Sequence, residues 1–199
     1  MIYGGNMIDV KSEPALFSKK IFLRGLDVDK DTPELYIILK NPDIHKWLGT
    51  EIPKNGNEVR QSIEKYCSSN EVYSWAIVDS NSRKTIGIYY LWKPIQKIDG
   101  NTIIPAESQR LARHCWRKGY MKESRKLVYN FAFNTLEVEE IHAQVWKKNI
   151  NSIKSMEHSG FKKYKEVEKS ILKYKKTYTE CHYRLTKENF IKSDLIKEN

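Results

Sequence analysis

Residues Trp116 to Glu123, with the sequence W-R-K-G-Y-M-K-E, form the stretch of this 199-residue chain that is most informative about chemistry. They join a predicted strand to the strongest predicted helix, Lys122 to Leu136. A helix N-terminus presents unpaired backbone N–H groups and about half a positive charge, so it can bind a phosphate. Gly119 lets the backbone approach a ligand closely, while Arg117 and Lys118 add positive charge. An ordinary basic turn would share these features, so this stretch alone does not distinguish such a turn from a phosphate-binding loop.

A second observation is a polar cluster one predicted strand further along. It begins with Asn149 and Ser152 and continues as M-E-H-S-G-F from Met156 to Phe161. Asn and Ser are common helix caps, so capping explains Asn149 and Ser152 as well as ligand binding does. The two interpretations are compatible, because a residue that caps a helix can also line a cofactor site.

Together the two clusters resemble the GNAT superfamily of acyl-CoA-dependent N-acyltransferases, in particular its RimJ/RimL-like branch. In that branch a loop of the form W-G-K-G-Y-M-T-E-A opens the third helix, and N-x-x-S followed by M-E-K-x-G-F marks the fourth. The matching stretches here are Trp116 to Ser124 and Asn149 to Phe161. Phe22 to Leu26 and Asn41 to Trp47 also resemble the start of the branch, so the resemblance covers nearly the whole chain.

The resemblance implies an α/β (α+β) fold, with a mixed, mostly antiparallel central sheet flanked by about four helices. It implies one domain over 1–199, and we expect flexible ends near 1–15 and 190–199. Two central strands would splay apart, here about Ile103 to Ala112 and Glu140 to Val145, and pantetheine would lie between them.

The resemblance also implies acetyl-CoA as co-substrate and no metal. The end of the first splayed strand would bind the pantetheine amides through its backbone, and the loop amides would bind the pyrophosphate. The implied cofactor-binding residues are Gln109, Arg110, Leu111, Arg117, Lys118, Gly119, Tyr120, Met121, Lys122, Asn149 and Ser152.

Three positions depart from the family pattern. Arg117 replaces the first glycine of the loop, which removes a residue tolerant of unusual backbone angles and adds a cation. Lys122 replaces the common threonine and adds a further charge near the phosphates. Met156 stands where many members place a tyrosine that protonates the leaving thiolate, and methionine cannot donate that proton.

Acyl transfer needs a base for the attacking amine and a proton for the departing thiolate. With Met156 excluded, Ser152 is the nearest candidate that the family resemblance supports for assisting the thiolate. For the base we select Glu107, since a carboxylate on the splayed strand could order a water beside the amine. The competing interpretation is that Glu107 is solvated or pairs with Arg110.

The elements that position these residues follow from periodicity. Strand and helix signals alternate in the order β, α, α, β, β, β, α, β, α, β, β, which predicts a mixed sheet with helices packed on it. Ile21 to Arg24 reads as the first strand, and Asp31 is the predicted N-cap of the helix that follows, with Pro33 in its first turn. A polar turn is flanked by two predicted strands, Trp75 to Val78 and Thr85 to Leu91, and this pattern predicts an antiparallel hairpin.

Four further segments complete the expected architecture. A second helix should begin near Asn57, and Ser152 to Ser159 should form a short helix that Gly160 ends in the left-handed conformation. Phe161 to Val167 and Tyr178 to Leu185 read as the last two strands.

Charge leaves one alternative open. The chain has 35 Lys and Arg against 25 Asp and Glu, so its formal net charge is +10. That surplus and the lysine-rich segment 162–176 suggest a nucleic-acid-binding module without catalysis, although no known nucleic-acid-binding motif accompanies them. We expect nucleic acid only as part of a ribosome or of a nucleotide-bearing substrate.

The remaining expectations concern partners and location. The acceptor would be a protein N-terminus or a small amine-bearing antibiotic or toxin such as an aminoacyl-nucleotide, so a role in antibiotic resistance is one possibility. We expect a monomer or homodimer. We expect a cytoplasmic location, because no secretory signal and no apolar run of about 20 residues occurs. Cys67, Cys115 and Cys181 should be free thiols, and His142 could face the substrate cleft.

Overall fold

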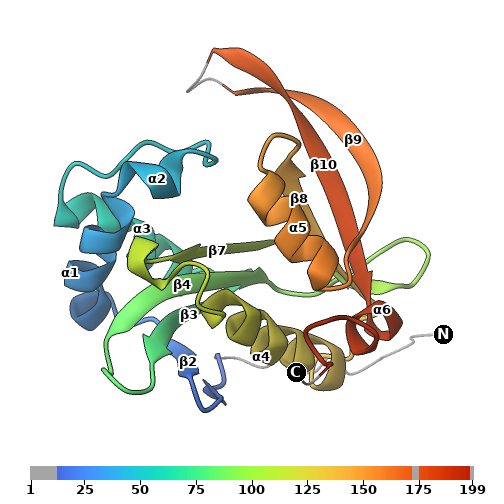
Figure 1. Ribbon diagram of the computed structural model, residues 1–199, viewed down its shortest axis with the longest axis horizontal. Helices are drawn as coiled ribbons and strands as arrows, with labels where there is room; N and C mark the ends of the chain where they lie inside the picture. Colours follow the sequence, from blue (N-terminus) through green and yellow to red (C-terminus); the bar gives the residue numbers. More distant parts are fainter. Residues whose placement is uncertain (1–12, 172–174, 198–199) are drawn as a thin grey trace.

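The computed structural model describes residues 13–171 and 175–197, which form two five-stranded sheets and six α-helices (Figure 1). Sheet A has the strand order β1 (Leu16–Phe17), β2 (Ile21–Gly25), β3 (Val72–Asp79), β4 (Thr85–Trp92), β7 (Glu107–Leu111). Sheet B has the order β5 (Ile95–Gln96), β6 (Thr102–Ile104), β8 (Glu140–Trp146), β10 (Lys176–Thr186), β9 (Lys162–Ile171). All pairings are antiparallel except that of β6 with β8. The mixed, mostly antiparallel fold is as predicted.

The helices are α1 (Val28–Leu39), α2 (Pro42–His45), α3 (Gly56–Cys67), α4 (Tyr120–Asn134), α5 (Ile150–His158) and α6 (Lys187–Ile191), with a short 3₁₀ turn at Arg113–Cys115. Prediction from sequence located α3, the β3–β4 hairpin, α4, β8, α5, β9 and β10. It missed α2, α6, β1 and β5, which are all five residues or shorter. Gly160 follows α5 at φ 91°, as predicted.

Sheet A is covered on both faces. Tyr73 packs edge-on against Phe131 of α4, whereas the hydroxyl of the next residue, Ser74, donates to the Tyr66 carbonyl of α3. Because successive strand residues point to opposite faces, α3 and α4 must lie on opposite sides of the sheet. All eight residues of β3 are therefore buried, and the core of the molecule is centred there.

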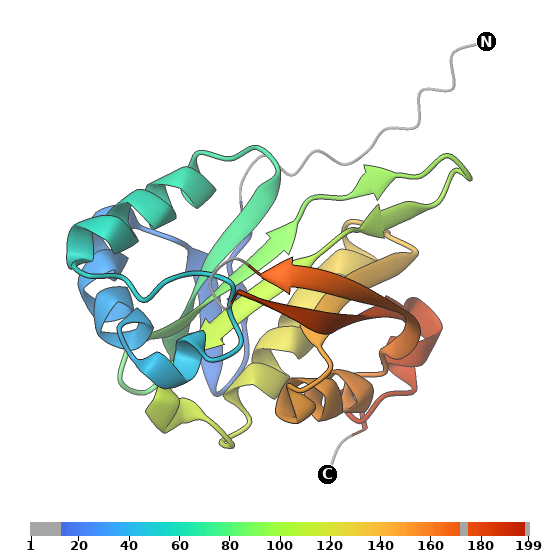
Figure 2. The same ribbon diagram turned by 90° about the horizontal axis from the view of Figure 1, so that it is seen from above.

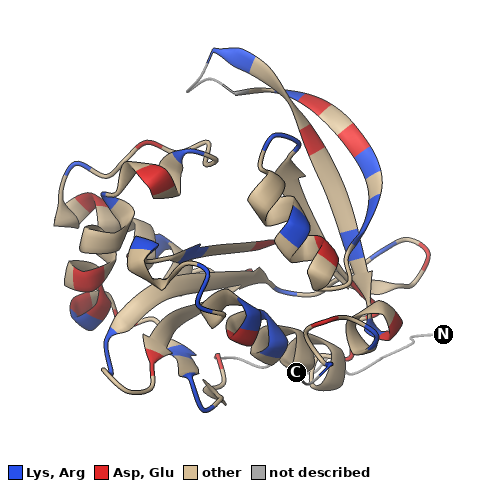
Figure 3. Cartoon of the chain, viewed as in Figure 1, with Lys and Arg blue, Asp and Glu red and all other residues tan. Residues whose placement is uncertain are grey.

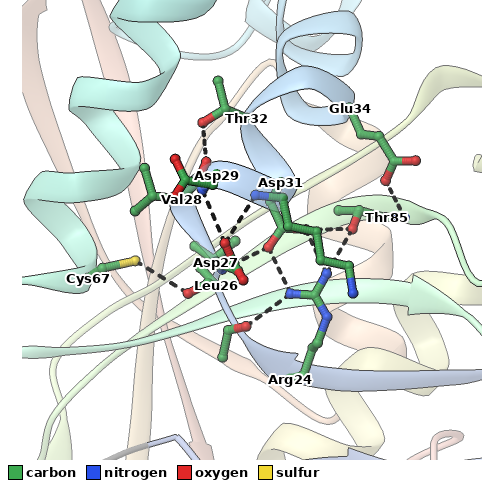
Figure 4. A network of polar contacts seen from close by, with 12 residues as sticks. Arg24, Leu26, Asp27, Val28, Asp29, Asp31, Thr32, Glu34, Cys67 and Thr85 are labelled. Atoms are coloured by element: carbon green, nitrogen blue, oxygen red, sulfur yellow. Dashed lines mark hydrogen bonds and ion pairs between the residues drawn. The ribbon is translucent and has the colours of Figure 1, made fainter.

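The start of α1 differs from the prediction. The helix begins at Val28, and the side chain of Asp27 caps it by accepting from the N–H groups of Asp29 and Lys30. Asp31 is fully buried, pairs with Arg24 at 2.7 Å and accepts from the Thr85 hydroxyl (Figure 4). Burial alone would raise the pKa of Asp31, but the hydrogen bonds from Arg24 and the Asp27 N–H lower it. Asp31 is thus wrong as the cap, because a tertiary ion pair takes its carboxylate.

The predicted strand over Ile103 to Ala112 is also wrong as a single element. The chain pairs with β8 at Ile103 and Ile104, and then crosses to sheet A, where β7 pairs with β4. Pro105 lies at the crossing point and has no N–H with which to continue a ladder. The split produces the splay, since β6 pairs with the start of β8 whereas β7, which follows β6 directly, belongs to the other sheet.

The ends of the described chain pack against the core. A carboxylate oxygen of Glu13 accepts from the Ser74 N–H, and the Pro14 carbonyl accepts from the Trp75 indole. Phe190 and Leu195 are buried. Of the ends predicted to be flexible, residues 1–12 and 198–199 lie outside the described residues. Cys67, Cys115 and Cys181 are free, as predicted.

No helix in the described part of the chain has the length and apolar character needed to cross a membrane.

Candidate active site

A cavity of about 800 Å³ lies where β7 and β8 diverge. Its walls are the segment around α2, strand β7, the loop into α4, strand β8 and helix α5. Figures 1 and 2 show how these elements are arranged. The predicted site residues that line it are Glu107, Gln109, Arg110, Leu111, Arg117, Gly119, Tyr120, Met121, Lys122, Asn149 and Ser152. The structure thus brings together both sequence clusters, and of the predicted set only Lys118 lies outside the lining.

Strand β7 offers the cavity a free backbone edge. Among the described strands β4 is its one neighbour, with Gln109 paired to Tyr89 and Leu111 to Gly87. The backbone N–H and C=O groups on the other edge of β7 have no strand partner and face the splay, although the Leu111 carbonyl accepts from the Trp116 indole at 2.7 Å. An extended amide chain can bind there as an added strand would.

The loop into α4 is shaped by two left-handed residues. Gly119 has φ 79° and Arg117 has φ 61°. The sequence suggested that replacing glycine by Arg117 loses this conformation, but the arginine adopts it despite its side chain, at a cost of about 1–2 kcal/mol. Left-handed residues within such a loop turn successive N–H groups into a concave anion site.

The N-terminus of α4 adds to that site. Within the described residues no side chain caps it, so its first N–H groups remain available to a ligand. Arg117 and Lys122 supply formal positive charge in the same wall of the cavity. Figure 3 shows basic segments at this loop and along the start of α4.

Helix α5 forms the wall beside β8. The Asn149 side chain caps it by accepting from the Ser152 N–H at 3.3 Å, so the capping interpretation is correct for Asn149. No hydrogen bond to the Ser152 hydroxyl occurs among the described residues, and this side chain lines the cavity. Met156 also contributes to the lining but is otherwise packed in the core.

Glu107 is the centre of a buried polar cluster. Its side chain is 2% exposed and accepts hydrogen bonds from the hydroxyls of Tyr89 and Tyr129, the latter at 2.9 Å. Arg125 of α4 lies 3.6 Å from a Glu107 oxygen and donates to the Ser155 hydroxyl of α5 at 2.7 Å. The interpretation of Glu107 as a solvated residue or a partner of Arg110 is therefore wrong, since its partners come from β4 and α4.

The protonation of this cluster follows from its burial. Burial, and then the charge of Glu107, raise the pKa values of Tyr89 and Tyr129 well above their usual value, so both remain hydrogen-bond donors. Burial alone would lower the pKa of Arg125, but Tyr129 and Glu107 raise it, so the guanidinium stays charged. The cluster holds the Glu107 side chain in one orientation at the cavity wall.

Coenzyme A fits the groups present. A pyrophosphate needs converging N–H donors and cations, which the loop and the start of α4 provide through Arg117, Gly119 and Lys122. The pantetheine arm needs backbone partners, which the free edge of β7 provides. The cavity also has the volume of a small-molecule site. Among residues 13–171 and 175–197, no group of three or more His, Cys, Asp and Glu side chains is arranged to hold a metal ion.

Two parts of the site were not predicted. The segment at α2 contributes five lining residues, and its shortness hid it from pattern analysis; they are Asp43, Ile44, Lys46, Trp47 and Leu48. Arg125 had a usable signal, because it lies three residues before Val128 on the apolar face of α4. A cation on an apolar helix face indicates a buried partner.

Other candidates lie away from the cavity. His142 is outside its lining and bonds to Glu140 at 2.8 Å and to the Tyr164 hydroxyl at 3.2 Å. In the lysine-rich segment 162–176, Lys163 pairs with Glu166 and Lys169 with Glu180. Lys173 of that segment lies outside the described residues.

Comparison with known proteins agrees with this geometry. The family described as "Acetyltransferase (GNAT) domain" matches residues 20–162, and the chain belongs to this family. It is similar to the probable N-acetyltransferase YjcK of Bacillus subtilis, with 26% identity over 160 residues, or 74% of this chain and 83% of the relative. The protein is accordingly an acyltransferase enzyme of a family that uses acetyl-CoA.

Solved structures share the fold. One is spermidine N-acetyltransferase from Vibrio cholerae in complex with CoA and spermine, with a TM-score of 0.72 and 16% identity, covering 87% of this chain and 99% of that one. Another is a putative ribosomal-protein-serine acetyltransferase from Vibrio cholerae, with a TM-score of 0.72 and 15% identity, covering 87% and 98%. At these identities the likeness establishes the GNAT fold.

Proposed function

We propose that the protein transfers an acetyl group from acetyl-CoA to a primary amine by direct attack within a ternary complex. The main support for this proposal is a single cavity that combines the loop into α4, the unpaired edge of β7 and the fixed carboxylate of Glu107. Acetyl-CoA, when bound, supplies the acetyl group as a thioester. The cofactor would be held by Gln109, Arg110, Leu111, Arg117, Lys118, Gly119, Tyr120, Met121, Lys122, Asn149 and Ser152. Family membership favours this function over a nucleic-acid-binding module.

Glu107 is the proposed general base. Its carboxylate lies at the cavity wall and is fixed by two phenols and a guanidinium, so it can order a water that accepts the proton of the attacking amine and passes a proton to the carboxylate. Ser152 is the proposed group that assists the departing thiolate, because it lines the cavity in the first turn of helix α5. Met156 has no proton to offer.

The Glu107→Gln variant tests the base. It keeps the shape of the side chain and its ability to accept from the two tyrosines, and kcat should fall by about 10²- to 10⁴-fold. The dissociation constant for coenzyme A should change little by comparison, whereas the melting temperature should fall, because the buried Arg125 guanidinium loses the charge of its partner. Glu157→Gln is the matched control, since Glu157 is an exposed carboxylate on α5 outside the cavity lining. A kcat within a few-fold of wild type across the pH range would exclude Glu107 as the base.

For the acceptor we propose the RimJ/RimL-like pattern, in which the amine belongs to a protein N-terminus or to a small antibiotic or toxin such as an aminoacyl-nucleotide. The similar structures support amine acceptors of more than one kind, since one is a spermidine N-acetyltransferase and another is a putative ribosomal-protein-serine acetyltransferase. A panel of N-terminal peptides, aminoglycosides, polyamines and aminoacyl-nucleotide analogues, assayed by thiol release, distinguishes these classes. Release with polyamines alone would overturn the RimJ/RimL-like assignment.

A further inference from the structure

A lysine remote in sequence contacts the loop that opens α4. Lys20 lies in the turn before β2, and its ammonium donates a hydrogen bond to the carbonyl of Lys118, 98 positions later. The same ammonium lies 4.8 Å from the centre of the Tyr120 ring. These contacts place the Lys20 ammonium beside the loop, where β2 packs against α4 (Figure 1).

Lys20 is itself held in place by its backbone. Its N–H donates to the Ser18 hydroxyl at 3.3 Å, and its carbonyl accepts from the Ser80 N–H at 3.1 Å. Ser80 follows Asp79, whose carboxylate accepts from the Tyr120 hydroxyl at 2.7 Å. Two turns at one end of sheet A therefore hold the residues on both sides of Gly119.

Peptide geometry links this contact to the cavity. In a trans peptide the C=O of one residue and the N–H of the next point in opposite directions. A Lys118 carbonyl directed at Lys20 therefore turns the Gly119 N–H away from Lys20. The lining agrees, because Gly119 borders the cavity and Lys118 does not. The ammonium also polarises the shared peptide, which makes its N–H a stronger donor.

We infer that Lys20 is a positioning residue for coenzyme A: it fixes the Lys118–Gly119 peptide so that the Gly119 N–H faces the pyrophosphate site. This inference rests on the proposed function for its ligand. Its structural part, the orientation of the loop, does not depend on any ligand. Lys20 acts through the loop backbone and makes no contact with the phosphates.

The test uses Lys20→Met, Lys20→Arg and Lys19→Met in the full chain. Lys19 is an exposed neighbour in the same turn, so Lys19→Met controls for loss of one charge. Titration calorimetry measures binding of coenzyme A and of 3′-dephospho-coenzyme A. Lys20→Met should weaken both by the same factor, about 5- to 10-fold, and raise KM while kcat at saturation stays within about 2-fold. Lys20→Arg should restore part of the affinity.

Hydrogen exchange of the ligand-free protein gives a second readout. Amides of residues 117–122 should exchange faster in Lys20→Met than in wild type or Lys19→Met, whether or not coenzyme A binds. If wild type fails to bind coenzyme A, the proposed function is wrong, and amide exchange still tests the loop orientation. Unchanged exchange overturns the inference. An affinity loss confined to the ligand with the 3′-phosphate also overturns it, because Lys20 would then contact that phosphate.

Discussion

Sheet A and the β9–β10 hairpin of sheet B differ in how deeply their side chains are buried. In sheet A every residue of β3 is buried, and helices cover both faces. In β9 the described side chains from Lys162 to Ser170 are exposed, apart from the half-buried Val167. The hairpin extends away from the body of the molecule, and basic and acidic segments alternate along it (Figures 1 and 3).

The difference shows where the site gets its rigidity. Strand β7 and the Glu107 cluster rest on sheet A, so the groups proposed for catalysis are fixed by packed apolar surface. Strand β9 is held by its backbone ladder to β10 and by ion pairs such as Lys147–Glu166, which contribute little each in water, whereas β10 also buries Tyr183 and Leu185 in the core. Substitutions in the two regions should therefore differ in size and in their response to salt and pH.

The largest expected effect is in the centre of sheet A. Ile77 is fully buried in β3, and Ile77→Ala should lower the free energy of unfolding by about 2–5 kcal/mol, through lost apolar contact and a residual cavity. Val167→Ala on β9 is a slightly smaller truncation of a half-buried side chain and should cost about 1 kcal/mol or less. Urea unfolding measures both. Equal losses would mean that the hairpin is as tightly packed as the core, and the comparison would fail.

A smaller effect is expected in the loop that leaves β7, where backbone conformation matters more than burial. Arg117→Gly and Arg117→Ala remove the same charge, but only glycine adopts φ 61° without strain. The glycine variant should be more stable than the alanine variant by about 1 kcal/mol, the reverse of the usual order. Thermal unfolding of the pair decides this, and an alanine variant of equal or greater stability would contradict the strained loop.

The smallest effect is expected at the ion pairs of the hairpin. Lys147 and Lys163 each donate to Glu166 at 2.8 Å, and these hydrogen bonds lower the pKa of Glu166 to about 2. Because the folded-state pKa lies below the ordinary value of about 4.3, the stabilisation is present above that pH and is lost as the pH falls towards 2.

Glu166→Gln should accordingly lower the melting temperature slightly at pH 7 and not at pH 2. High salt should reduce the difference at pH 7, because Glu166 is solvent-accessible. A difference in melting temperature that is independent of both pH and salt would show that packing, and not charge, holds the hairpin.

Prediction from sequence succeeded where a local pattern and the tertiary environment agree. The turn between β3 and β4 and the left-handed Gly160 are specified by a few neighbouring residues, and both were located. Prediction failed where a distant partner takes a side chain. Asp31 has the residue type of a cap, but Arg24 and Thr85 bind it in the core.

The site residues divide in the same way, into those set by local sequence and those set by distant partners. The order of the glycine loop and the asparagine–serine helix identified two walls of the cavity, the loop into α4 and helix α5, because those residues act through local backbone geometry. The partners of Glu107 were not predicted, since Tyr89 and Tyr129 come from different elements. Lys20 was missed for the same reason, since it contacts the loop across the fold, whereas the segment at α2 was missed because that helix is too short to show a periodic pattern.

The sequence by itself determined the family, the order of the longer helices and of most of the longer strands, and the position of the loop that opens α4, because these depend on residue type and spacing along the chain. Only the tertiary structure decided that Arg117 is held in a left-handed conformation, that Glu107 is buried among phenols and a guanidinium, and that Lys20 contacts the loop. These depend on which distant residues the two sheets bring together. Their energies come from burial and direct contact, which a linear pattern does not contain.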